Sequence, residues 1–177
     1  QNPFSELLIS LLSLSASRLY RYDVFELLKH PLVSARFRLS IGEILQLEQW
    51  TRASGVRWGL DSTHRADQGL NEALQHTWDF GLDRLMLGVL MGEDTHRGVR
   101  PLYRGLAPLS VGDRAEEELL DRFCEFFEAF KTCRTKLTKR HTPAAWCDAL
   151  IDSIRALSAA SNQEARALRQ DVESDLY

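Results

Sequence analysis

The sequence predicts an all-α fold: one multi-helix domain over residues 1–177 with two long ordered loops. Apolar residues recur at three- and four-residue intervals through most of the chain, which is the period of an amphipathic helix. Residues typical of helix starts and stops bracket these stretches, and no strand-like alternation persists. Hydrophobic residues make up 44% of the 177 positions and charged residues 27%, which suits a single domain with its own core.

The first helix is predicted near the amino terminus of the sequence. Its apolar face is formed by Phe4, Leu7, Leu8, Leu11 and Leu12. The run from Leu7 to Ala16 is as apolar as the middle of a signal peptide. However, no Lys or Arg precedes it, and Glu6 stands where a signal peptide needs a positive charge. We therefore expect a buried amphipathic helix. The chain starts with Gln, which suggests a piece excised from a longer protein.

Three more helices are expected before residue 92. One runs from Asp23 to Lys29 and is stopped by Pro31, and a second, capped by Ser40, ends before Gly55. A third spans His76 to Met91. The glycine-rich segments 55–71 and 92–112 are predicted to be the two long loops.

The last third of the chain has the most regular pattern. Its apolar seam steps by four and three residues through Leu119, Phe123, Phe126, Phe130, Cys133 and Leu137. Thr142-Pro143 predicts the start of the next helix, which turns Trp146, Leu150, Ile154 and Leu157 inward. Ser161 and Glu164 resemble a capping box and predict a final helix with Ala165, Leu168 and Val172 on one side.

Several function classes have no support in the sequence. The net charge is −3 and the pI about 6.0, unlike the strongly basic balance of most nucleic-acid-binding domains. The cysteines Cys124, Cys133 and Cys147 form no Cys-x-x-Cys pair and are expected to be reduced thiols of a cytoplasmic protein. No phosphate-binding GxxxxGK[ST] loop, nucleophile elbow or HExxH pair occurs, so we predict no catalytic residue, cofactor or metal ligand.

The densest group of functional residue types is the stretch RWGLDSTHR at residues 57–65. A metal-dependent hydrolase would need side chains such as those of Asp61 and His64, and of His76 and Asp79 further on. Isolated Asp and His residues in loops usually make turn and capping bonds instead, and we prefer that interpretation. Arg57 and Trp58 have the side chains that stack on a base or form a partner hot spot, but a tryptophan between Val56 and Leu60 more often anchors a loop to the core, and we prefer that interpretation. Arg57 and Arg65 are candidate contacts to DNA or a partner if they point outward, and are architectural if they pair with Asp61 or Asp79; we expect the architectural role.

A basic run forms the second candidate site. Between residues 131 and 140 there is no acid, and the candidate contacts to DNA or a partner are Lys131, Arg134, Lys136, Lys139 and Arg140. The functional interpretation is a phosphate-contact patch. The alternative is a basic helix end opposite an acidic helix start, as the helix dipole favours, and we prefer it.

Two signatures resemble the RecC family, the gamma subunits of exodeoxyribonuclease V. They are RWGLD followed by HR, and QHTWDFGLDRLMLGVLMG at residues 75–92. The upstream run SRLYRYDVFELLKHPLVSARF and the later TPAAW helix start are similar too. Asp79 departs from the family pattern, in which a basic residue often stands there. The signature residues expected to be structural are Trp58, Asp61, His76, Trp78, Phe80, Gly81 and Arg84.

The resemblance implies a helical accessory (2B-like) domain of a degenerate superfamily 1 helicase fold. Such a domain is non-catalytic, whereas the whole RecBCD complex is an ATP-dependent helicase–nuclease of double-strand break repair and recombination. The implied partners are RecB-like and RecD-like subunits, double-stranded DNA ends and single-stranded DNA, with no membrane; ATP and Mg belong to the partner subunits. The domain would scaffold partner subunits and line a DNA path. The alternative is an autonomous helical DNA-binding module that uses residues 131–140.

Overall fold

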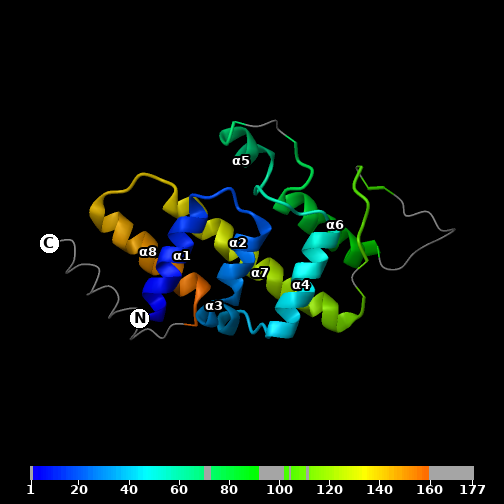
Figure 1. Ribbon diagram of the computed structural model, residues 1–177, viewed down its shortest axis with the longest axis horizontal. Coiled ribbons are helices and arrows are strands. Elements are labelled where there is room, and N and C mark those ends of the chain that lie inside the picture. Colours follow the sequence, from blue (N-terminus) through cyan, green and yellow to red (C-terminus); the bar gives the residue numbers. More distant parts are fainter. Residues whose placement is uncertain (1, 70–72, 92–101, 104, 111, 160–177) are drawn as a thin grey trace.

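The computed structural model describes residues 2–69, 73–91, 102–103, 105–110 and 112–159 (Figure 1). All regular secondary structure in these ranges is helical, and one isolated bridge joins Tyr103 to Leu106. The all-α prediction is confirmed for this part of the chain. The helices are α1 (Pro3–Ser15), α2 (Arg21–Lys29), α3 (Pro31–Arg36), α4 (Ile41–Ala53), α5 (Ser62–Asp67), α6 (Trp78–Met91), α7 (Arg114–Leu137) and α8 (Pro143–Leu157).

Helix α7 is the axis of the domain. It runs diagonally through the molecule, and α1, α4, α6 and α8 pack against it (Figure 1). Every residue of the predicted seam from Leu119 to Leu137 is buried, which confirms that prediction. Aromatic rings tie the seam to the amino-terminal helices: the Phe25 and Phe123 rings stack at 5.8 Å, and Phe37 meets Phe126 edge-on at 5.4 Å.

The predicted helix starts at Ser40 and Thr142 are confirmed. The Ser40 hydroxyl accepts the Glu43 amide at 3.3 Å, and the Glu43 carboxylate accepts the Ser40 amide at 2.8 Å, which together make a capping box. The Thr142 hydroxyl accepts the Ala145 amide at 3.4 Å, with proline at the first helical position. Helix α1 buries Phe4, Leu7 and Leu11, as its pattern predicts.

Helix α2 ends at Lys29 as predicted, but two short helices were not predicted and one helix start was wrong. Pro31 also begins α3, because a first-turn proline lacks only an N–H that would have no partner in the helix. The segment expected to be a loop over 55–71 contains α5, which the Asp61 carboxylate caps. Helix α6 begins at Trp78 and not at His76, because His76 has a left-handed backbone with φ 68°.

Two other predictions fall partly or wholly beyond the described ranges. The final helix expected after Ser161 lies outside them, as does most of the loop over 92–112. Cys124, Cys133 and Cys147 are free thiols, as expected. None of the described helices is long and apolar enough to cross a membrane.

Candidate functional site

The two signature stretches meet and pair through their backbones. The Arg57 amide donates to the His76 carbonyl at 2.9 Å, and the Trp78 amide donates to the Gly59 carbonyl at 2.9 Å. Gly59 has φ 84°, a left-handed conformation that glycine adopts without strain. We call residues 54–60 together with 76–84 the signature junction. It holds the end of α4 beside the start of α6, although residues 54–77 separate the two helices in the sequence.

Trp78 anchors the signature junction in the core. Its side chain is fully buried, and its indole N–H donates to the Leu19 carbonyl at 3.0 Å. Its ring lies 5.0 Å from that of Phe127 on α7, centroid to centroid. A buried indole needs such a partner for its N–H, and here the partner is the backbone just before α2. Trp78 therefore connects the amino-terminal helices, the junction and the α7 axis.

Gly81 and Arg84 hold the other side of the signature junction. A Cβ at Gly81 would overlap Val56 Cγ2 and lie 2.8 Å from Ser54 Oγ, so only glycine allows α6 to approach this closely. The Arg84 guanidinium donates to the Ser54 carbonyl through Nη1 at 2.7 Å and to the Ala107 carbonyl through Nε at 2.8 Å. The guanidinium also lies 5.8 Å from the centre of the Phe80 ring. Arg84 thus clamps two loop segments to α6.

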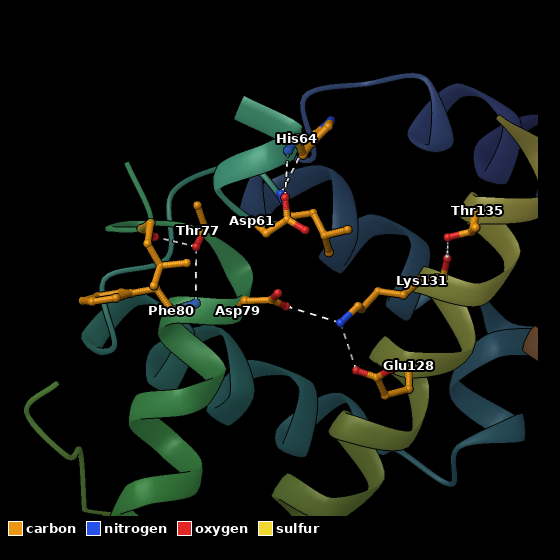
Figure 2. Close-up of polar contacts among 10 residues, drawn as sticks. Asp61, His64, Thr77, Asp79, Phe80, Glu128, Lys131 and Thr135 are labelled. Atoms are coloured by element: carbon orange, nitrogen blue, oxygen red, sulfur yellow. Dashed lines mark hydrogen bonds and ion pairs between the residues drawn. The ribbon is translucent and has the colours of Figure 1, made fainter. Parts of the chain in front are cut away.

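Asp61 and His64 are occupied by local bonds (Figure 2). The Asp61 carboxylate accepts the His64 amide at 2.7 Å, and His64 Nδ1 accepts the Leu60 amide at 3.0 Å. Burial and the nearby charge of Arg134 lower the pKa of His64, so its ring is neutral at pH 7. His76 Nδ1 lies 2.9 Å from the Gly55 carbonyl. Among the described residues, no group of three or more His, Cys, Asp or Glu side chains is placed to hold a metal ion.

Asp79 faces Lys131 of α7. Lys131 Nζ lies 3.4 Å from an Asp79 carboxylate oxygen and 3.2 Å from one of Glu128, so the lysine bridges α6 and its own helix (Figure 2). Burial raises the pKa of Asp79, and the charge of Lys131 opposes that rise. Asp79 of the second signature is therefore paired with the first lysine of the basic run.

The basic run does not form one patch. Lys136 pairs with Asp152 of α8 at 3.2 Å. Arg134 is partly buried; burial lowers the pKa of its guanidinium, and the charges of Asp61 and Asp67 oppose this. Lys139 and Arg140 are exposed and make no ion pair with any residue that the structure describes.

Arg57 and Arg65 differ in their surroundings. Arg57 is exposed, and neither arginine forms an ion pair with Asp61, Asp79 or another described residue. The Arg65 guanidinium lies 4.4 Å from the centre of the half-buried Trp58 ring, and its Nη1 donates to the carbonyls of Ala73 at 3.1 Å and Gln75 at 2.8 Å. The alternative in which both arginines pair with acids of the signatures is wrong for this structure.

The sequence reasoning missed two neighbours of Trp58. Arg18 Cζ lies 6.0 Å from the centre of the Trp58 ring, and the Tyr20 ring lies 6.4 Å from it, centroid to centroid. Both residues stand in the run SRLYRY, in which arginines and tyrosines alternate around the buried Leu19, and Arg18, Tyr20 and Tyr22 are exposed. That alternation was the available signal, but only the tertiary fold brings it to Trp58.

Comparison with known proteins agrees with the two signatures. The family described as the fourth domain of the RecBCD enzyme subunit RecC matches residues 1–176. The chain belongs to the RecC family. It is 43% identical over 155 residues to the RecBCD enzyme subunit RecC of Escherichia coli K12, covering 88% of this chain and 13% of that protein. The RecC of Mycobacterium tuberculosis H37Rv is 31% identical over 175 residues, covering 99% and 16%.

A third relative gives the same proportions. The RecC of Mycolicibacterium smegmatis is 33% identical over 159 residues, covering 90% of this chain and 14% of that protein. The chain therefore spans less than a fifth of the length of these RecC relatives, with the largest share being 16%.

Proposed function

We propose that this chain is a non-catalytic helical domain of a RecC-type subunit. The subunit works within a RecBCD helicase–nuclease complex in double-strand break repair, with RecB-like and RecD-like partners in the cytoplasm. The domain scaffolds these partners and lines part of a DNA path, in the manner of a helical accessory (2B-like) domain. ATP and Mg serve the partner subunits.

The observation that carries the proposal is the signature junction. The residues that identify the family are committed to holding loops and helices together: Trp78 binds a backbone carbonyl in the core, and Arg84 binds two more. Catalytic groups need free lone pairs or protons near a substrate-sized space. Asp61 Oδ1, His64 Nδ1 and the Arg84 guanidinium are instead engaged with backbone, which suits a rigid scaffold.

The alternative function, an autonomous DNA-binding module built on residues 131–140, has weaker support. Lys131 and Lys136 each pair with an acid from another helix, and Arg134 is partly buried. This leaves Lys139 and Arg140 as the exposed cations of the run that form no ion pair with a residue that the structure describes. Two phosphate contacts give little affinity on their own, because each contributes only modestly through counterion release.

Hydrogen exchange on a full-length RecC-type subunit carrying this domain tests the scaffold. We expect at least one exposed surface within residues 2–159 to become protected when the partner subunits are added. Alanine substitutions on that surface should then weaken assembly while the ATP hydrolysis rate per assembled complex stays unchanged. The core amides of α7 serve as the internal control, since they are protected in both states.

Two results would overturn the proposal. Unchanged exchange over the whole domain on assembly would exclude docking. A fall in ATP hydrolysis per assembled complex would place the domain in the catalytic cycle. For the alternative module, a Lys139→Glu/Arg140→Glu variant is informative: if these side chains bind phosphates, the salt dependence of DNA binding should decrease by about 0.7–0.9 in log–log slope for each lost contact.

A further inference from the structure

A basic and aromatic surface lies beside the signature junction, outside the packed core. We call it the Trp58 surface and define it as Trp58, the three residues Arg18, Tyr20 and Arg65 whose side chains lie near its ring, and the exposed Arg57 that precedes it in the chain. Two short segments form it and are fixed to each other by backbone bonds. The Gly59 amide donates to the Arg18 carbonyl at 2.9 Å, and the Arg21 amide donates to the Arg57 carbonyl at 3.1 Å. Its side chains are therefore presented on a rigid backbone.

The rings and guanidinium groups of this surface already stack on one another. Arg65 lies over Trp58 at 4.4 Å from the ring centre and is held there by two carbonyls, so this pair is pre-organised. Tyr20 lies beside the pair and is 47% exposed. Tyr20 precedes α2, and its side chain makes no capping bond. An exposed ring next to a fixed cation stack is a platform for another planar group.

The charge of the Trp58 surface is positive. Arg18 and Arg57 are exposed, and none of its three arginines forms an ion pair with a residue that the structure describes. Arg65 is held over Trp58 by two carbonyls, whereas Arg18 and Arg57 are exposed and available to contact anionic groups of a ligand.

We propose that the Trp58 surface binds single-stranded nucleic acid. A base stacks on Tyr20, flanked by the Trp58–Arg65 pair, while Arg18 and Arg57 contact the phosphates on either side. Duplex DNA would use the arginines but not the exposed ring, since its bases are already stacked on one another. An acidic peptide would use the arginines but not the exposed ring. This inference deepens the proposed DNA path and rests on that function.

The expected effects follow from the two kinds of contact. Loss of one base–aromatic stack typically weakens single-strand binding about 5- to 150-fold, so Tyr20→Leu should do so and Tyr20→Phe should not. Arg57→Ala should lower the salt dependence of single-strand binding by about 0.7 in log–log slope. Arg155→Ala, at an exposed arginine on α8, is the matched control and should change neither quantity.

The experiment uses the full-length RecC-type subunit and an oligothymidylate that carries a photoreactive 5-iodouracil. Cross-linked peptides are mapped by mass spectrometry, and affinities are measured by fluorescence anisotropy at several salt concentrations. We expect a cross-link at Tyr20 or Trp58 that disappears in Tyr20→Leu. Circular dichroism of each variant verifies that the fold is intact.

The outcomes separate this inference from the proposed function. Normal assembly with the partner subunits but no cross-link within 18–22 or 57–65 overturns the inference alone. Weakened assembly, with unchanged oligonucleotide binding in Tyr20→Leu and Arg57→Ala, would make the Trp58 surface a protein interface and also overturn it. Failure of the unaltered domain to become protected on assembly would instead overturn the scaffold.

Discussion

Replacing Gly81 with alanine tests how closely α6 packs at the signature junction. The new methyl group would overlap Val56 Cγ2 and lie 2.8 Å from Ser54 Oγ. Gly81 is buried and helical, so no backbone change is needed to accept alanine. The substitution therefore adds one methyl group to a space that is already filled.

The size of the effect comes from two opposing terms. Alanine is a better helix former than glycine by about 0.5–1 kcal/mol, which alone would stabilise the protein. Overpacking by a methyl group in a filled core costs about 1–3 kcal/mol. Because the overlap involves a β-branched side chain with few alternative rotamers, we expect the upper part of that range. The net loss is about 1–2 kcal/mol, or about 2–8 °C in melting temperature for a chain of this size.

Thermal unfolding followed by circular dichroism measures this loss, with Gly42→Ala as the matched control. Gly42 is also helical, but a Cβ there meets nothing within 4 Å, so its alanine variant should keep or raise the melting temperature. A Val56→Ala substitution removes the overlapping methyl groups and should recover part of the loss in the Gly81→Ala background. The reasoning is refuted if Gly81→Ala melts at or above the temperature of the parent chain.

Three further predictions concern the polar contacts. Arg84→Lys keeps the charge but cannot reach both carbonyls, so urea unfolding should show a loss of about 1–3 kcal/mol. The pKa of His64 is lowered in the folded state, so the unfolded state binds the His64 proton more readily. The free energy of unfolding should therefore decrease as pH falls below the ordinary histidine pKa of 6.5. Exchange protection of the Leu60 amide, which donates to His64, should decrease over the same range, and protection that holds at pH 5 would contradict this. Lys131→Met removes the cation that opposes the rise in the pKa of Asp79, so the folded form should bind the Asp79 proton still more tightly than the unfolded form does. The free energy of unfolding should therefore fall more steeply with rising pH in the variant than in the parent, which urea unfolding between pH 4 and 7 measures.

The regular helices could be predicted from the sequence because their signals are local. The seam of α7 repeats at helical spacing for its whole length, and Ser40 and Thr142 cap helices with bonds that reach only three residues along the chain. Such bonds form in the same way in any tertiary context. Helix α5 was not predicted, although Asp61 is an equally good cap. It has only six residues, and an apolar pattern of that length does not indicate a helix.

The partners of the site residues could not be predicted, because they come from distant parts of the chain. Arg84 binds carbonyls 30 residues before it and 23 residues after it, and Lys131 pairs with an acid 52 residues away. Nothing in the spacing of the sequence specifies these pairs. The sequence shows which polar side chains can form such contacts, and the fold determines which of them have a hydrogen-bond or ion-pair partner.

The stretch RWGLDSTHR shows why density of functional residue types is weak evidence for catalysis. Its Asp and His lie three residues apart, the separation that an N-cap and the helical amide it binds require, and both are used in that way. Its first arginine and its tryptophan remain at the surface because Gly59 turns the backbone so that residues 57 and 59 pair with residues 18–21. Its acid and histidine build the turn, and Arg57 and Trp58 are not needed for these bonds.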